Sequence, residues 1–210
     1  MKIELNIFTN CHKSSPDISI VKNTYDSFIK TFGEYPVKIY CDKHPNIHNL
    51  QTYKHNLSKI TNNIIITESL SDVYIKSIEN SDADYLFQLE NDWEFNNNIN
   101  HTLEDITAVM SELGIYHFRF NKRQNLLAGW DRELLESYFN GLQYCITNNL
   151  SNNPHIIDRK KYDSELKHYI KVVPGSKGIE HELNKHGHLK SIIYGTIGYE
   201  ATITHTDGRH

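Results

Sequence analysis

Residues 84–95 read Asp-Tyr-Leu-Phe-Gln-Leu-Glu-Asn-Asp-Trp-Glu-Phe, and they carry the clearest structural signal in this 210-residue chain. Residues 85–89 are mostly large and apolar, as expected for a central strand that is covered on both faces. Three carboxylates follow, those of Glu90, Asp92 and Glu94. Glu90 and Asp92 are two positions apart, so at a strand end both side chains can face one crevice. In open α/β sheets ligands bind at such strand ends, and carboxylate oxygens select Mg²⁺ or Mn²⁺.

Acidic residues after a strand often only solvate a turn or cap the next helix, and this alternative stays open. The combination with an adjacent aromatic residue and a following helical pattern favours the ligand-binding interpretation. Residues 97–113 carry apolar side chains at close to helical spacing, namely Ile99, Leu103, Ile106, Val109, Met110 and Leu113.

At these residues the chain resembles the metal-dependent glycosyltransferases of the GT-A fold. Glu90-Asn91-Asp92 is similar to the Glu-Asp-Asp form of the acid-x-acid motif in N-acetylglucosaminyltransferases, and Trp93-Glu94-Phe95 is similar to the usual continuation of that motif. The resemblance implies that Asp92 binds the metal on the nucleotide-sugar pyrophosphate, with Glu90 near the ribose or a metal-bound water. Asn91 departs from the family pattern: its amide can still ligate the metal or hydrogen-bond the nucleotide, so it stays a candidate binding residue, but it removes one negative charge and could weaken metal binding.

The length favours one domain with a substantial core. The formal net charge is −4 and no dense Lys/Arg tract is present, which disfavours nucleic acid as a partner. No apolar run approaches the roughly 18 to 20 residues of a membrane span, and the N-terminal residues lack a signal-peptide pattern, so we expect a cytoplasmic protein. The three cysteines lack metal-site spacing and predict neither a zinc site nor a disulfide framework: Cys11, Cys41 and Cys145.

Strand and helix signals alternate in the first half, which predicts an α/β fold with a mostly parallel central sheet flanked by helices. This is the Rossmann-like arrangement of a single GT-A-like domain, with a nucleotide-sugar-binding half at 1–96 and an acceptor-binding half at 97–210. The predicted strands are 3–7, 37–41, 64–66 and 85–89. A first helix is predicted to start at 15–17 and to end before Gly33, and a second is predicted at 70–78.

The second half is less regular. Strands are predicted at 115–120 and 144–147, a turn at 152–154 leading into a helix with Tyr162, Leu166 and Ile170, and a helix at 178–185. Residues 191–194 and 201–204 are predicted to close the fold as a hairpin-like pair.

The resemblance also suggests a second metal ligand late in the chain, where His205 is the main candidate and His210 a lesser one. For the nucleotide, Thr9 and Asn10 end the first predicted strand and Asp42 ends the second, so a parallel sheet would place them at one edge. An acid after the second strand resembles the base-contacting or ribose-contacting residue of the family. A turn-forming role for Asp42 is the alternative.

An inverting transferase needs a carboxylate within reach of the acceptor hydroxyl, and the short helical segment after Gly178 offers Glu180 first and Glu182 second. The alternative role of Glu180 and Glu182 is that of acids in the first turn of a helix, where the helix dipole stabilises them. Asp131 is a third candidate base, and the adjacent Trp130 could stack on a sugar or belong to the core.

A basic group, Arg119 with Lys122 and Arg123, could meet a phosphate or the acceptor, or form a solvated loop. Together these features predict a glycosyltransferase that uses Mn²⁺ or Mg²⁺ and a UDP-sugar or GDP-sugar. Its acceptor would be a glycan, a lipid-linked molecule or another hydroxyl compound. The alternatives are a non-catalytic nucleotide- or carbohydrate-binding module of the same fold and a metal-dependent nucleotidyltransferase, although residues 9–13 lack the glycine-rich loop of the latter.

Overall fold

The computed structural model describes residues 1–10, 16–43, 45–127, 133–172, 179–185 and 191–206. Its first half builds one side of a nine-stranded sheet from parallel strands in the order β3-β2-β1-β4. These strands are β1 (Ile3–Asn10), β2 (Val37–Asp42), β3 (Ile64–Thr67) and β4 (Tyr85–Glu90), and they alternate with α1 (Ser19–Phe32), α2 (Ile47–Leu57) and α3 (Leu70–Glu79). The carboxyl ends of all four strands therefore meet at one sheet edge.

The second half extends the sheet with mixed pairing in the order β9-β6-β10-β8-β7. Its strands are β6 (His117–Arg119), β7 (Leu135–Phe139), β8 (Leu142–Thr147), β9 (His155–Asp158) and β10 (Ser191–Tyr194). β9 runs antiparallel to both β4 and β6, whereas β10 is parallel to β6. The helical segments are α4 (Leu103–Leu113), α5 (Arg159–Lys161), a π-helical turn (Tyr162–Leu166), a 3₁₀ turn (Lys167–Tyr169) and α6 (Glu180–Leu183).

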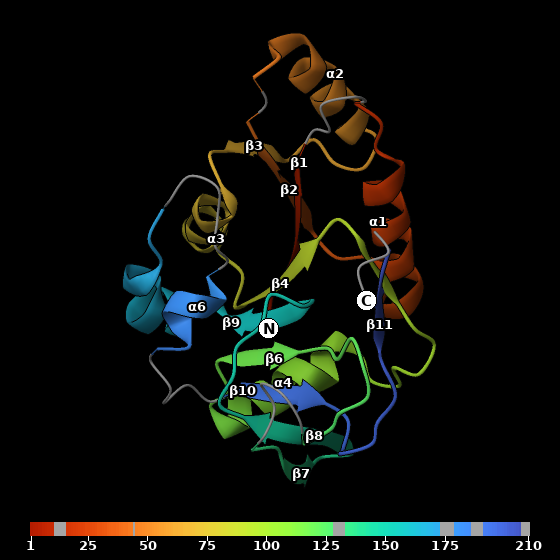
Figure 1. The fold of residues 1–210 in the computed structure, drawn as a ribbon, viewed down its shortest axis with the longest axis vertical. Coiled ribbons are helices and arrows are strands. Elements are labelled where there is room, and N and C mark those ends of the chain that lie inside the picture. Colours follow the sequence, from red (N-terminus) through yellow and green to blue (C-terminus); the bar gives the residue numbers. More distant parts are fainter. Residues whose placement is uncertain (11–15, 44, 128–132, 173–178, 186–190, 207–210) are drawn as a thin grey trace.

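Buried side chains lie on both faces of the sheet, as the mostly apolar run of β4 requires. Phe87 packs on one face with the apolar residues of α1 and α4. Its neighbour Leu86 packs on the other face, with residues of α3, the π-helical turn and α6. Figure 1 shows α1 and α3 on opposite sides of the strands and α2 beyond the end of β1. The predicted α/β class, with helices flanking a central sheet, is confirmed.

The predicted helix at 97–113 begins later than expected, at Leu103. Thr102 and Asp105 form a capping box, in which each side chain accepts a hydrogen bond from the backbone N–H of the other residue. This reciprocal pair fixes the first turn of the helix. Asn98 instead donates its side-chain amide to the carbonyl of Ala201 and so belongs to a loop. Gly114 ends the helix in the left-handed conformation at φ 66°.

The predicted hairpin-like pair at the end of the chain is wrong. β10 lies inside the main sheet between β6 and β8, while β11 (Ile203–His205) pairs with β5 (Trp93–Phe95) in a separate two-stranded sheet. Helix α2 and strands β5, β7 and β9 were not predicted, and the helix expected around Leu166 is broken into short turns. No helix within the described residues is long and apolar enough to cross a membrane.

Candidate active site

The turn after β4 is held from two sides. The Thr24 hydroxyl on α1 donates to the carbonyl of Asn91 at 2.7 Å, and the backbone N–H of Thr206 donates to the carbonyl of Asp92 at 2.8 Å. The N–H of Phe95 donates to the Ser27 hydroxyl at 2.8 Å, which anchors β5 on the same helix. The turn thus joins α1 to the last described segment of the chain.

Strand pairing brings His205 to Asp92. In the β5–β11 ladder His205 lies opposite Trp93, and its Nε2 is 3.2 Å from Oδ2 of Asp92. The Trp93 ring meets the imidazole edge-on, with 4.4 Å between ring centroids, and restricts its orientation. Both side chains of the pair are mostly buried, at 15% exposure for His205 and 18% for Asp92.

The donor atoms of this pair fit a divalent cation. Two ligands in adjacent positions around an octahedral ion with bonds of about 2.1 Å lie about 3 Å apart, close to the observed separation. A carboxylate oxygen with an imidazole nitrogen is a donor set that Mn²⁺ accepts. Within the described residues no group of three or more His, Cys, Asp and Glu side chains could hold a metal. A cation at this pair would complete its coordination with phosphate oxygens and water, as Mg²⁺ commonly does.

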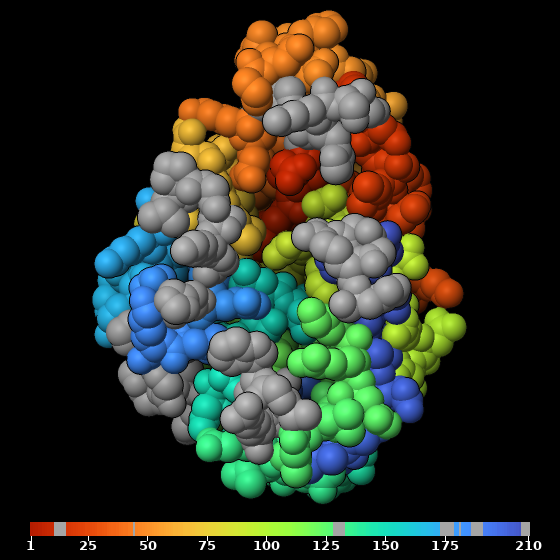
Figure 2. Space-filling view, in the orientation of Figure 1, coloured from red at the N-terminus to blue at the C-terminus, as the bar shows by residue number. Residues whose placement is uncertain are grey.

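The residues predicted to bind the nucleotide lie at the carboxyl ends of neighbouring strands. Asn10 pairs in register with Asp42, and Phe8 with Glu90, so Asn10, Asp42 and Glu90 share one sheet edge. In Figure 2 the surface is hollowed here, with red atoms of the β1 end recessed between α1 and α3. The arrangement of Asn10, Asp42 and Glu90 suits a ligand that lies across the strand ends.

Thr9 and Asp42 differ in what they can offer a ligand. Thr9 is buried and its hydroxyl lies 2.6 Å from the Tyr53 hydroxyl of α2. Asp42 is half-buried and accepts a hydrogen bond from Thr67 at 3.0 Å. Burial raises the pKa of the Asp42 carboxyl, Thr67 opposes this, and Asp72 adds to it.

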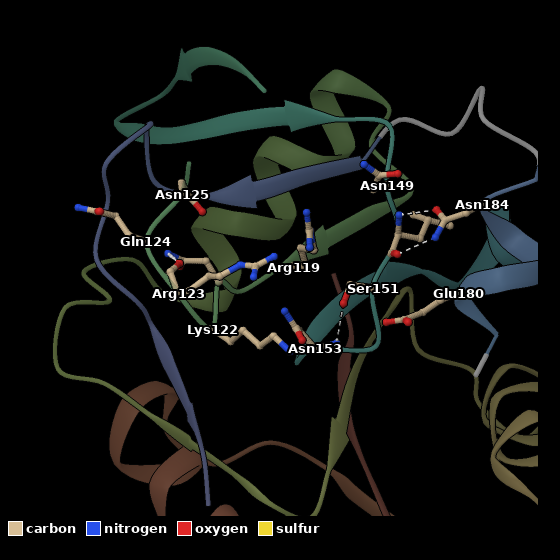
Figure 3. A pocket seen from close by; sticks show the side chains of 12 residues that line it. Arg119, Lys122, Arg123, Gln124, Asn125, Asn149, Ser151, Asn153, Glu180 and Asn184 are labelled. Carbon is tan, nitrogen blue, oxygen red and sulfur yellow. Dashed lines mark hydrogen bonds between the residues drawn. The ribbon is translucent and has the colours of Figure 1, made fainter. Parts of the chain in front are cut away.

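A pocket of about 490 Å³ lies beyond β4, between the end of β6 and α6. In Figure 3 basic side chains reach in from the loop after β6, while Glu180 and Asn184 reach in from α6 on the opposite side. The described lining residues are Arg119, Asn121, Lys122, Arg123, Gln124, Asn125, Asn149, Leu150, Ser151, Asn153, Glu180 and Asn184.

The structure separates the two candidate bases on α6. Glu180 lines the pocket, and one of its carboxylate oxygens accepts a hydrogen bond from the backbone N–H of Asn152. Glu182 forms an ion pair with Lys185 at 2.9 Å and does not belong to the described lining. Only Glu180 is therefore placed to meet a molecule in this pocket.

Tyr74 on α3 connects the acidic strand end with the pocket. Burial raises the pKa of this tyrosine well above its usual value, and the charges of Glu90 and Glu180 raise it further. Its hydroxyl donates to Asn152 Oδ1 at 3.3 Å, in the loop that also holds Glu180. The two carboxylates thus lie near one buried phenol.

A buried histidine pair supports the same loop. His117 on β6 stacks on His155 on β9 with ring centroids 4.3 Å apart. Nδ1 of His155 lies 2.7 Å from the carbonyl of Asn153, and Nδ1 of His117 lies 2.9 Å from the Tyr162 hydroxyl. Burial lowers the pKa of His155 to about 4, with a smaller lowering from Arg119 and an opposing effect of the hydrogen bond to the Asn153 carbonyl. Burial also holds the pKa of His117 well below its usual value, so both imidazoles are neutral at neutral pH.

Sequence reasoning missed Tyr74, both buried histidines and the pocket-lining asparagines. Their side chains come from separate elements, so no local spacing indicates that they meet. Asp131, Trp130, His210 and Cys11 lie outside the described residues. Cys41 and Cys145 are buried.

No protein-family model matches this chain, and no curated protein sequence matches it. Solved structures do resemble it. A TarS structure from S. aureus, residues 1–349, matches with a TM-score of 0.52 and 11% identity over 98% of this chain. GalNAc-T7, crystallised with UDP, GalNAc and Mn²⁺, matches with a TM-score of 0.60 and 10% identity over 96% of this chain.

The chain spans 60% of the TarS structure and 44% of GalNAc-T7. Both are glycosyltransferases of the GT-A type, so the chain has a GT-A-like fold and the predicted resemblance holds at the level of the fold. At these identities the likeness shows the fold alone.

Proposed function

We propose that this protein is a metal-dependent glycosyltransferase that moves a sugar from a nucleoside diphosphate sugar to a hydroxyl acceptor. The observation that carries the proposal is the approach of Asp92 and His205 to 3.2 Å beside the carboxyl edge of a GT-A-like sheet. The resemblance to GalNAc-T7, which was crystallised with UDP and Mn²⁺, supports the same ligand classes.

In this proposal Asp92 and His205 would hold Mn²⁺ or Mg²⁺ at the diphosphate of the donor. The bound cation supplies a Lewis acid that offsets the negative charge of the leaving diphosphate. Asn10, Asp42 and Glu90 contact the base and ribose of a UDP-sugar or GDP-sugar across the strand ends. Thr9 shapes this site from beneath, because its hydroxyl is buried against Tyr53.

Glu180 serves as the general base. The acceptor oxygen forms a bond to the anomeric carbon as the bond from that carbon to the diphosphate breaks, and Glu180 takes the hydroxyl proton. A single displacement of this kind inverts the anomeric configuration. The hydrogen bond from the Asn152 N–H holds one carboxylate oxygen, so the position of the base is set before the acceptor binds.

A binding module without turnover is the second candidate, and Asn91 favours it because the turn lacks one acid of the family pattern. Both candidates predict metal-dependent binding of a nucleoside diphosphate, but only the enzyme releases the diphosphate from a nucleotide sugar.

The experiment is a thermal-shift screen of UDP, GDP, CDP and dTDP with and without Mn²⁺, followed by turnover of the matching nucleotide sugars. A ligand that binds only the native state raises the unfolding temperature, by an amount equivalent to about 2.7 kcal/mol at 100 times its Kd. We expect one or two of the diphosphates to stabilise the protein, and only with Mn²⁺. No stabilisation by any of them would contradict both candidates, and stabilisation without turnover would favour the module.

A further inference from the structure

The pocket beside Glu180 has the opposite charge to the chain as a whole. The formal net charge of the protein is −4. The described lining nevertheless combines three cations, Arg119, Lys122 and Arg123, with a single carboxylate, Glu180. A surplus of positive charge in a concave site raises the local concentration of anions.

Two of these cations, Lys122 and Arg123, are carried by a braced loop after β6. The side-chain amide of Asn121 donates to the carbonyls of Arg123 at 3.0 Å, Tyr199 at 3.2 Å and Glu200 at 3.0 Å. Asn125 donates in the same way to three carbonyls of residues 194–196. The backbone that carries Lys122 and Arg123 is therefore organised without a ligand, which lowers the entropic cost of binding one.

Lys122 and Arg123 have charge available for a ligand. Both are exposed, and no carboxylate in the described ranges of the chain forms an ion pair with either. Figure 3 shows both side chains, with that of Arg119, on the side of the pocket opposite Glu180. A guanidinium presents a planar fork of N–H donors that matches the oxygens of a phosphate or a carboxylate.

The rest of the described lining suits hydroxyl groups. Apart from the charged residues it consists of Asn, Gln and Ser side chains with one apolar residue, Leu150. Amide and hydroxyl side chains both donate and accept hydrogen bonds, as sugar hydroxyls do. A volume of about 490 Å³ lies within the range of small-molecule sites.

We propose that the acceptor is an anionic polyhydroxy compound, a sugar or polyol that carries a phosphate or carboxylate near the reacting hydroxyl. The anion lies against Lys122, Arg123 and Arg119, which directs a hydroxyl on the far side of the molecule towards Glu180. This inference rests on the proposed transferase function, because only a transferase would use the bound molecule as an acceptor. The charge preference of the pocket is a property of the described residues and can be measured without turnover.

The test compares three probes of similar size: a hexose 6-phosphate, the corresponding hexuronate and the neutral hexose. Binding to the full chain is measured by calorimetry at two salt concentrations. We expect the better of the two anions to bind at least about 10-fold more tightly than the neutral sugar, with the preference reduced by salt. The better anion identifies the acceptor group as phosphate or carboxylate.

The double variant Lys122→Ala/Arg123→Ala should lose roughly 10-fold to 100-fold of the anion affinity while binding the neutral sugar as before. The matched control is Lys54→Ala/Lys59→Ala, which removes two exposed positive charges in and after α2, away from the pocket. Equal binding of charged and neutral probes would overturn the inference. So would an equal loss of anion affinity in both double variants.

A third result would assign the cations to the donor instead. If Lys122→Ala/Arg123→Ala weakened binding of UDP or GDP with Mn²⁺ and left the sugar phosphate and hexuronate unaffected, the inference would be wrong and the transferase proposal would stand. If the protein bound the anionic probes selectively but turned over no nucleotide sugar, the charge preference of the pocket would stand and the transferase proposal would be wrong. The two proposals therefore fail separately.

Discussion

The acidic turn after β4 and the basic pocket beside α6 are held by different kinds of contact. The turn is fixed mainly through main-chain atoms, since β5 pairs with β11 and the Thr206 N–H binds the Asp92 carbonyl. The pocket loops are fixed by side chains, because Asn121, Asn125 and Asn184 each bind backbone groups of other segments. The difference predicts that changes at the turn affect chemistry first, whereas changes around the pocket affect both chemistry and stability.

The largest effect is expected from Asp92→Ala. If Asp92 binds the metal as proposed, its loss removes several kcal/mol of charge stabilisation at the leaving diphosphate, so turnover should fall roughly 10⁴-fold. The unfolding temperature should change little, because the backbone contacts of the turn remain. Glu94→Gln, which changes an exposed acid in the adjacent strand, is the matched control and should retain activity. If the Asp92 variant kept most of its turnover, the turn after β4 would not take part in catalysis.

Glu180→Gln should lower turnover roughly 10²-fold to 10³-fold, because the amide cannot take the acceptor proton. Binding of the nucleoside diphosphate should persist, because Glu180 lines the pocket and is not one of the two proposed metal ligands, Asp92 and His205. Glu182→Gln provides the control on the same helix and should stay within a factor of about two. If the Glu182 variant were the inactive one, the placement of the base in the pocket would be wrong.

The buried histidine pair makes the stability of the protein sensitive to acid. The pKa of His155 is about 4 in the native state, below the usual value of 6.5 that applies after unfolding. Between these values the unfolded chain binds a proton that the native state does not, so the free energy of unfolding is unaffected above about pH 6.5 and decreases as the pH falls towards 4. This contribution reaches roughly 3 kcal/mol.

His155→Gln should therefore flatten the decline in stability across that interval, measured by denaturant unfolding at half-unit pH steps. His48→Gln, which removes an exposed histidine from α2, is the control and should preserve the decline. An unchanged slope in the His155 variant would mean that this imidazole is not held neutral by burial.

The smallest effects are expected from substitutions that each remove one side-chain support, at Asn125 beside the pocket and at Thr24 beside the acidic turn. Asn125→Ala leaves three carbonyls without their amide donor and should cost about 2 kcal/mol of unfolding free energy. Thr24→Val removes one hydrogen bond to the Asn91 carbonyl and should cost about 1 kcal/mol, because the strand pairing of the turn remains. Asn97→Ala, at an exposed loop position, sets the baseline. A larger loss at Thr24 than at Asn125 would reverse the comparison.

The parallel half of the sheet could be predicted from sequence because its strands carry apolar residues in short runs or in alternation, and helical patterns lie between them. Residues 85–89 predicted β4 and, with the family resemblance, pointed to Asp92 and His205. The structure places these two side chains together, while their role in metal binding stays a prediction. The start of α4 was missed because the pattern at 97–102 has helical spacing, whereas the capping box begins at Thr102.

The second half could not be predicted as well because distant contacts determine it. β9 contains only two apolar residues and exists because β4 and β6 pair with it on either side. The sequence offered Glu180 first and Glu182 second as candidate bases, but only the packing of α6 places one in the pocket and the other beside Lys185. An asparagine such as Asn125 gives no sequence signal at all, since its three carbonyl partners are about 70 residues away.

The most direct measurement is a Mn²⁺ titration followed by electron paramagnetic resonance, with and without the nucleoside diphosphate selected by thermal shift. The wild-type protein should bind one Mn²⁺ more tightly when the diphosphate is present. Asp92→Asn should abolish this binding, and His205→Gln should weaken it about 10-fold to 100-fold. Manganese binding that was the same in the wild type and in both variants would contradict the central claim that this pair joins the protein to a diphosphate.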